Sequence, residues 1–402
     1  MTLVNIISAV GNNAGVWPLL VRDCGIEIPS KVAMTYSQNM KDSKQMAKNA
    51  VRERLIDEYG TSAIWLGGIP LMDYLCNKGI EKLGYNPNIN PSLFKEDAKQ
   101  GMQKNIEKFK EIAPNEVKEM EKVLKNKKTF ERLLAGKFLL STAIPVLLMG
   151  YCLPKMNFAL TAKLRKNQAE KQALTSQKDT GGQNISFKGA VSTLANMSTV
   201  NKMAVTDGGL TVGRVATARN KYEKLEMGFK MAGMMFLNFV APWWIAAFFD
   251  KASGKLFNTN VNLDPKILND KEFLESIKNN SLKMPEKDVI EFLDKNPKSQ
   301  FSKYAEKFCG IRYLDNEIRD PRAFVNEDKI LNLKKEIEKF AKQAKETGNV
   351  DSFAKKALRV KSGNILANVA LSSFLLAVAL PKATFILRKK VTGSDAEPGL
   401  VK

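Results

Sequence analysis

The chain contains no histidine in its 402 residues, and this absence excludes most of the usual catalytic machinery. Hydrolysis through Ser-His-Asp or Cys-His groups, histidine proton shuttles, and zinc or haem sites with histidine ligands all need an imidazole. The four cysteines, Cys24, Cys76, Cys152 and Cys309, have no C-x-x-C spacing, so neither a zinc knuckle nor a dithiol redox motif is encoded. We therefore expect a protein that is not an enzyme, that needs no cofactor or metal, and that keeps its cysteines reduced.

Strand signals are scarce, and a secretory signal is lacking. Residues 1–21 are uncharged but only moderately apolar and have no basic n-region, so a cleaved leader is not expected. Whether this segment spans the membrane, lies in its interface or re-enters it stays open. Apolar residues in the charged segments follow helical spacing; Ile330, Leu333 and Ile337 belong to one such stripe. The expected fold class is all-α.

Charge is missing from four stretches, and these are the most informative segments of the chain. Phe138–Pro154, Met231–Phe249 and Ser362–Pro381 contain 17, 19 and 20 residues, and about 20 helical residues cross the hydrocarbon core of a bilayer. The fourth stretch, Tyr59–Met72, reaches membrane length only by taking in Asp73, so it is either a span or a re-entrant hairpin. Because Met231–Phe249 is apolar around its whole circumference, membrane spans are favoured over buried helices of a large soluble protein.

Two short phrases occur twice and indicate an internal duplication. The sequence LPKMNF at 153–158 returns as LPKATF at 380–385, each time at the end of an apolar stretch. Pro70 and Pro242 are followed at equal distance by NIN and NVN. The same order of features on both sides of a basic linker predicts tandem units that enter the membrane from the same side, as a parallel repeat.

The expected organisation is an integral membrane protein with two tandem two-span helical units and helical extramembrane inserts. Its segments are an N-terminal apolar segment and charged helical lead-in (1–59); a first membrane unit (60–171) with spans at about 60–77 and 138–154; a flexible basic linker (172–206); a second membrane unit (207–390) with spans at about 231–249 and 362–381 and an insert at 255–360; and a disordered tail (391–402).

Candidate site residues fall into two groups. Asp73 and Lys230 are charges within or next to expected spans, where an ionisable group is a functional candidate by default. The second group anchors the span ends: proline closes the apolar run, lysine enters the headgroup layer, phenylalanine lies along the interface, and tryptophan suits the headgroup boundary. These anchors are Pro154, Lys155, Phe158, Pro381, Lys382, Phe385, Trp243 and Trp244.

The net charge of +21 draws the chain toward anionic surfaces. Nucleic acid is not expected as a partner, because basic residues mostly alternate with acidic ones and many aromatic residues lie in the apolar runs. We expect the lipid bilayer and its anionic headgroups as partners, together with a protein that binds the 255–360 insert or a second copy of the chain. Basic residues after the LPKxxF phrases favour a cytoplasmic linker and C-terminus.

Three functions stay open at this stage. The first is a non-enzymatic, multi-pass membrane protein with a structural, scaffolding or interaction role. The second is a small transporter or pore built from the parallel repeat. The third is a membrane enzyme that uses only carboxylate, lysine, tyrosine or cysteine chemistry. The sequence favours the first.

Overall fold

The computed structural model describes residues 2–11, 16–41, 43–95, 100–169, 199–259, 261–315 and 317–395. Helices make up 81% of the structure, and strands make up 1%. Its one sheet is a short ladder in which β1 (Tyr313–Leu314) pairs antiparallel with β2 (Ile318–Arg319), with Leu314 opposite Ile318. The expected all-α fold class is therefore confirmed.

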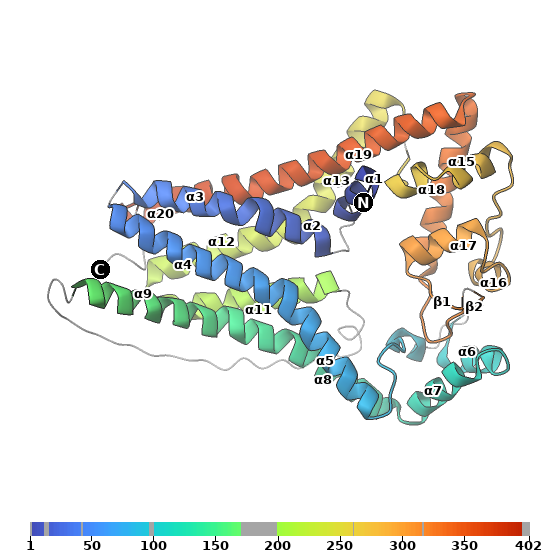
Figure 1. Cartoon of the computed structure of the whole chain (residues 1–402), viewed down its shortest axis with the longest axis horizontal. Coiled ribbons are helices and arrows are strands. Elements are labelled where there is room, and N and C mark those ends of the chain that lie inside the picture. The colour runs from blue at the N-terminus through green and yellow to red at the C-terminus, as the bar shows by residue number, and fades with distance from the viewer. Residues whose placement is uncertain are drawn as a thin grey trace.

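Long helical rods lie side by side and form a bundle (Figure 1). Local chemistry sets several of their starts: Ser43 Oγ accepts a hydrogen bond from the backbone N–H of Met46 at 3.0 Å, and Asn220 Oδ1 accepts one from the N–H of Glu223 at 2.9 Å. In chain order the helices of the bundle are α1 (Leu3–Gly11), α2 (Val16–Leu20), η1 (Val21–Glu27), α3 (Ile28–Asn39), α4 (Lys44–Ala63), η2 (Ile64–Gly68), α5 (Ile69–Lys82), α8 (Lys127–Leu147), η4 (Leu148–Cys152), α9 (Leu153–Ala169), α11 (Thr199–Thr217), α12 (Lys221–Met235), η5 (Phe236–Val240), α13 (Ala241–Phe257), α19 (Val350–Phe374), η7 (Leu375–Ala379) and α20 (Leu380–Thr392).

Five rods share one local feature, a π-helical segment that ends two residues before a proline. Proline has no N–H to donate, and its ring clashes with the carbonyl four residues earlier in a regular α-helix. The wider π turn gives that ring room, so the rod continues through the proline. The segments are η1, η2, η4, η5 and η7, and the prolines are Pro29, Pro70, Pro154, Pro242 and Pro381.

Three helices of the described chain are long and apolar enough to cross a membrane. They are Lys127–Leu164, Lys221–Phe257 and Val350–Thr392. The spans expected at 138–154, 231–249 and 362–381 each lie within one of them. The expected first span, about 60–77, lies in the continuous rod α4–η2–α5 and is not among the three.

The rods pack in a similar way in both halves of the chain. In the first half α4 packs on α9 and α5 on α8; in the second half α12 packs on α20 and α13 on α19. A further helix precedes each of these pairs. The helix α3 lies on α4 and also touches η7 of the second half, whereas α11 lies on α12 and also touches α8 and η4 of the first half. The two halves are thus interlocked through α3 and α11.

The helix α11 corrects one expected boundary. Residues 199–206 were assigned to the flexible linker, but the structure has them in α11, with Met203 buried against Trp65. Small residues misled the assignment, because here they allow close packing: Gly213 lies so near Gly150 that a Cβ on Gly213 would be 3.1 Å from the Cα of Gly150. The rest of the expected linker, 172–198, and the tail residues 396–402 lie outside the described residues.

The end of α9 and the start of α11 lie at opposite ends of the bundle (Figure 1). The side chain of Asn157 in α9 donates to the backbone oxygen of Glu53 in α4, at 2.8 Å, and α9 runs from there toward the start of α4. By contrast, Lys202 at the start of α11 contacts Asp73 in α5.

Two inserts of shorter helices lie at one end of the bundle (Figure 1). The larger insert has its own apolar core, in which Phe273 and Phe340 have ring centroids 5.4 Å apart. The first insert contains η3 (Pro91–Phe94), α6 (Met102–Phe109) and α7 (Pro114–Lys125). The second contains α14 (Pro265–Leu268), α15 (Lys271–Lys278), α16 (Val289–Lys295), α17 (Gln300–Tyr304), η6 (Ala305–Cys309), β1, β2 and α18 (Glu327–Glu346).

The two inserts pack against each other, which the sequence did not predict. The buried side chain of Gln100 exchanges two hydrogen bonds with the backbone of Val325, both at 2.8 Å. The side chain of Asn105 donates to the backbone oxygen of Pro321 at 2.8 Å. Apolar residues of α7 and its approach contact Leu314 and Ile318 at the β ladder. The inserts therefore form one joint module that connects the two halves of the chain.

Candidate functional site in the bundle interior

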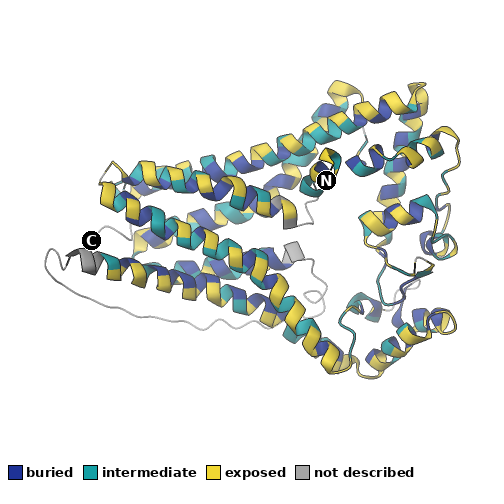
Figure 2. Cartoon of the chain, viewed as in Figure 1, coloured by how far each residue is buried: buried dark blue, intermediate teal, exposed yellow. Residues whose placement is uncertain are grey.

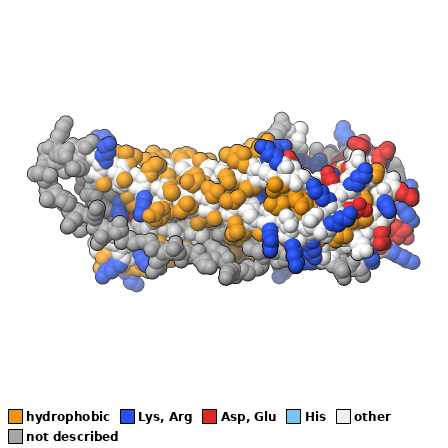
Figure 3. Space-filling view, turned by 90° about the horizontal axis from the view of Figure 1, so that it is seen from below, with side chains coloured by type: hydrophobic (Ala, Val, Ile, Leu, Met, Phe, Trp, Pro, Cys, Tyr) orange, Lys and Arg blue, Asp and Glu red, His pale blue; other side chains and the backbone are white. Residues whose placement is uncertain are grey.

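The bundle has apolar side chains outside and charged side chains inside. Figure 2 shows buried residues in stripes that run along its helices, and on the face drawn in Figure 3 apolar side chains cover the bundle while charged ones gather over the inserts. The exposed large apolar residues include Leu55, Tyr59, Leu225, Phe229, Trp243, Trp244, Phe248 and Ile386. The buried charged residues include Arg22, Asp23, Glu27, Lys31, Glu53, Glu58, Lys202, Asp207, Arg214, Glu223, Lys230 and Arg388.

Single helices show the same arrangement, with apolar side chains on the outer face and charged side chains on the inner face. In α20, Ile386 is 69% exposed whereas Arg388 is 1% exposed. Helical residues two positions apart in sequence lie about 200° apart around the axis, so these two side chains point to opposite faces. In a water-soluble protein an exposed arginine and a buried isoleucine would be the rule. A face of this kind suits hydrocarbon as its surroundings, because polar groups in lipid turn toward the interior of a bundle.

The interior ion pairs centre on Glu58 of α4. Its carboxylate accepts from Lys230 of α12 at 2.8 Å and from Arg54 at 3.2 Å, and it lies 3.4 Å from the ammonium group of Lys31 in α3. Lys31 also forms an ion pair with Glu27. Lys230, a candidate from the sequence, is therefore neutralised by a carboxylate of the other half of the chain.

Further ion pairs join the two halves on either side of this centre. Arg214 of α11 contacts both carboxylate oxygens of Asp57, at 2.7 Å each, and donates to the hydroxyl of Thr61 at 2.5 Å. The guanidinium of Arg219 lies 2.8 Å from Glu223 and 3.4 Å from Glu53. Together with Arg388, which pairs with Glu226 at 2.6 Å, these groups form what we call the interior charge network: Glu27, Lys31, Glu53, Arg54, Asp57, Glu58, Arg214, Arg219, Glu223, Glu226, Lys230 and Arg388.

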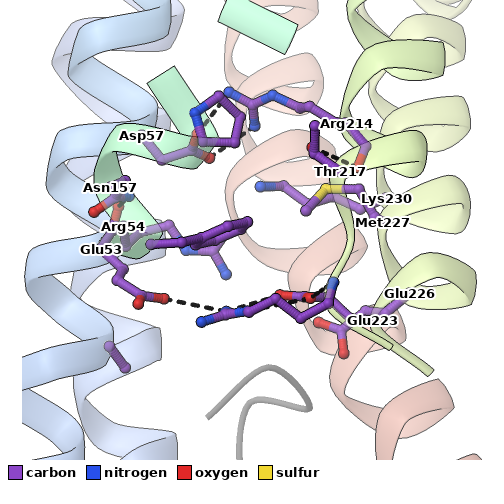
Figure 4. Close-up of a pocket in the computed structure, with 14 residues that line it drawn as sticks. Glu53, Arg54, Asp57, Asn157, Arg214, Thr217, Glu223, Glu226, Met227 and Lys230 are labelled. Carbon is purple, nitrogen blue, oxygen red and sulfur yellow. Dashed lines mark hydrogen bonds and ion pairs between the residues drawn. The ribbon is translucent and has the colours of Figure 1, made fainter. Parts of the chain in front are cut away.

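A cavity of about 70 Å³, the first cavity, opens within this network (Figure 4). Figure 4 shows Asp57 and Arg214 on one side of it and Glu53 and Glu223 on the other. Arg219 forms ion pairs with these two glutamates. Both halves of the chain supply its lining. The charged residues among that lining are four acids and four bases: Glu53, Asp57, Glu223, Glu226, Arg54, Arg214, Arg219 and Lys230. The balance of charges suits a small salt ion or a zwitterion and gives no preference for one sign.

Asp73, the other charged candidate, is paired as well. The ammonium group of Lys202 lies 2.7 and 2.8 Å from its two carboxylate oxygens. The pair joins α5 to the start of α11, away from the first cavity. The structure thus does not bring Asp73 and Lys230 together, and it gives each a partner that the sequence had not identified.

The two repeated phrases lie against the interior charge network. Pro154 is buried and Lys155 is exposed, with its ammonium group 2.6 Å from the hydroxyl of Tyr151. Phe158, expected along the membrane interface, instead lines the first cavity, with the guanidinium of Arg219 4.1 Å from its ring centroid.

The second phrase has the same arrangement. Lys382 is exposed, Pro381 is half-buried, and the guanidinium of Arg388 lies 5.0 Å from the ring centroid of Phe385. Each phenylalanine therefore covers an interior arginine, which is a favourable cation–π geometry. The remaining anchors, Trp243 and Trp244, are 67% and 65% exposed, as lipid-facing side chains would be.

Sequence reasoning missed most of the network because its charges resembled a solvated surface. By composition, the segments RERLIDE (52–58) and RNKYEKLE (219–226) are typical of charged, water-exposed helices. The sequence did indicate that these helices have one apolar and one charged face, because Leu55, Tyr59, Leu225 and Phe229 alternate with the charges at helical spacing. Which face turned inward could not be decided without the packing of the other helices.

Among the described residues, no group of three or more acidic or cysteine side chains is placed to hold a metal ion. All four cysteines are free. In the second insert, burial raises the pKa of the Cys309 thiol to about 11 and that of Tyr313 to about 12. Both groups are therefore protonated at neutral pH.

Comparison with protein-family models, curated proteins and solved structures finds no significant match to the chain.

Proposed function

We propose that the chain is an integral membrane protein built from two tandem units. Each unit consists of a lead helix (α2–η1–α3 or α11), two long rods interrupted before a proline, and an insert between the rods. The repeated π-helix and proline pattern and the matching contacts of α4–α9 with α12–α20 support this division. The spans are those expected at about 60–77, 138–154, 231–249 and 362–381, and the lead helices supply much of the polar interior.

We further propose that the bundle transports a small charged or zwitterionic solute and is not an enzyme. The observation that carries this proposal is the interior charge network, in which charged groups of both units meet around the first cavity. Buried ion pairs contribute little net stability compared with apolar side chains of similar size. Ionisable groups inside a membrane bundle characteristically mark the path of an ion or substrate.

The described state is closed to a solute. The first cavity has room for a few water molecules only. Transport then requires ion pairs between the units to separate, as expected for a parallel repeat whose halves move relative to each other. The pairs Arg214–Asp57 and Arg219–Glu53 each join the first unit to the second and are the groups that would open.

Light-scattering measurements on proteoliposomes test this function. Vesicles with the full chain are exposed to a hypertonic step of sodium chloride, glycine or potassium glutamate. We expect faster re-swelling than in empty vesicles for at least one of these solutes, because only a carried solute enters with water. The double variant Asp57→Leu/Arg214→Met, which replaces one ion pair with apolar side chains, should lose the faster phase, whereas Leu225→Ala on the lipid-facing side should keep it.

Vesicles as tight as empty ones for all three solutes would contradict transport of this class. So would equal rates for the chain and its double variant. A structural or interaction role, which the sequence favoured, would then be the better proposal. Its specific support is the joint insert module, which connects the two units and carries exposed apolar residues such as Ile112.

A further inference from the structure

A second cavity, of about 40 Å³, lies beside the interior charge network, and both polar and apolar side chains line it. Carboxylates from four positions reach it: Asp23, Glu27, Glu58 and Asp207. The hydroxyl residues Thr61 and Ser62 and the amide residue Asn238 complete its polar lining. These side chains come from η1, α4, α11 and η5, so both proposed units contribute to the cavity.

Several of these oxygens have no hydrogen-bond donor. The buried atoms Asp23 Oδ1, Glu27 Oε2 and Asn238 Oδ1 accept no hydrogen bond from the described residues. Each of the three side chains belongs to a residue that is more than nine-tenths buried. A buried acceptor without a donor is costly, so an occupant that donates hydrogen bonds or carries positive charge would stabilise the site.

The charges around the cavity leave one carboxylate without a contacting cation. Glu27 pairs with Lys31, Glu58 pairs with Lys230 and Arg54, and the carboxylate of Asp23 lies 3.7 Å from the guanidinium of Arg22. The carboxylate of Asp207 has neither a hydrogen bond nor an ion pair among the described residues. Arg214 acts on it only through space, because the guanidinium of Arg214 is bound to Asp57. The charged groups that face Asp207 and Asp23 are Arg22, Glu27, Lys31, Glu58 and Arg214.

We propose that the second cavity binds one monovalent cation, a proton or Na⁺, held by Asp207 and Asp23 with the amide oxygen of Asn238. The cation would contact Asp207, the carboxylate of this cavity that has no cation against it among the described residues. Oxygen acceptors without donors are the ligands that a hard cation takes. The inference rests on the proposed transport function, in which this cation would be the coupling ion, and it gives that function an energy source.

Tryptophan fluorescence tests the binding without any flux. Trp65 lines the second cavity, so the full chain with Trp17, Trp243 and Trp244 replaced by phenylalanine reports on it alone. The purified chain in detergent is titrated with sodium chloride against choline chloride at constant ionic strength, and separately with pH at constant sodium. We expect a saturable fluorescence change. A response to Na⁺ at fixed pH identifies Na⁺ as the occupant, and a response to pH alone identifies a proton.

Variants decide whether the response comes from this cavity. In Asp207→Asn the saturable change should disappear, whereas the matched surface variant Asp351→Asn should leave it unchanged. If Asp207→Asn does not fold, Asn238→Leu removes only a neutral ligand and should weaken half-saturation by about tenfold or more. The absence of a saturable response to both sodium and pH, or a response that persists in both cavity variants, would overturn the proposal. Because no transport is measured, this failure is distinguishable from a failure of the transport function.

Discussion

Single residues set how closely the helices of the two halves approach. Gly213 of α11 and Gly150 of η4 meet backbone to backbone, which only residues without a Cβ permit. Small residues at such crossings let membrane helices pack closely. Gly136 in α8 has open space around its missing Cβ and offers a comparison within the same bundle.

Substitution at these two glycines should have opposite effects. Gly213→Ile forces side-chain atoms against the backbone of Gly150, and we expect a loss of about 1–3 kcal/mol in the free energy of unfolding, as for overpacking in a core. Gly136→Ala should be neutral or stabilising by up to about 1 kcal/mol, because alanine favours helix. Thermal unfolding in detergent measures both. Equal melting temperatures for the two variants would contradict the close approach of α11 and η4.

The thiol of Cys309 gives a prediction that depends on pH. Burial raises the pKa of this thiol from 9.0 to about 11, and its Sγ lies 3.6 Å from the backbone oxygen of Lys329. A raised thiol pKa favours the neutral form in the folded state. The contribution of the neutral Cys309 thiol to the free energy of unfolding is therefore complete below pH 9 and is lost as the pH rises toward 11.

Alkylation of a chain with Cys309 as its only cysteine measures this pKa. The thiolate is the reactive form, so at pH 8 the folded chain should react about a hundredfold more slowly than the unfolded chain, for a difference of about two pKa units. The rate should rise about tenfold per pH unit until the pKa is reached. Similar rates for folded and unfolded chains at pH 8 would show that the insert does not bury this thiol.

Helices were the part of the fold that the sequence predicted best. Three apolar runs without charge, each ending in or containing a proline, identified the membrane-length rods. The π-helical segments could not be foreseen, because they are the response of a packed rod to its proline. The helix α11 was missed because its glycines and threonines have loop composition, and its packing partners are distant in sequence. Ion-pair partners such as Glu58 for Lys230 are more than 170 residues apart and follow only from the packing.

The ion pair between Asp57 of α4 and Arg214 of α11 gives a prediction at the scale of whole helices. Asp57→Asn leaves the guanidinium of Arg214, which is 4% exposed, without its counter-charge. Removing one partner of a buried ion pair costs about 3–5 kcal/mol, whereas exchanging both partners for apolar groups is close to neutral. We therefore expect Asp57→Asn to unfold at a much lower temperature than the double variant Asp57→Leu/Arg214→Met. Additive losses, with the double variant worse than the single one, would show that the pair is exposed to solvent.

At the scale of the whole molecule, the chain is a bundle with a polar interior, capped at one end by two inserts that pack on each other (Figure 1). The membrane interpretation follows from the positions of the polar and apolar side chains and not from composition alone. Charged side chains are buried in the bundle, whereas Trp243 and Phe248 are exposed on its outer face. Water would be a poor solvent for that face, whereas hydrocarbon suits it. The interior charge network would be equally out of place on a surface in contact with lipid.

The most direct test of this account is quenching of tryptophan fluorescence by brominated phospholipids in reconstituted vesicles. Two variants of the full chain are compared, one that keeps only Trp243 and Trp244 and one that keeps only Trp65, which is 4% exposed. The account predicts strong quenching of the first variant and little quenching of the second, because bromine on the acyl chains reaches only lipid-facing side chains. Unquenched Trp243 and Trp244, or equal quenching of both variants, would contradict a membrane bundle with an apolar exterior and a charged interior.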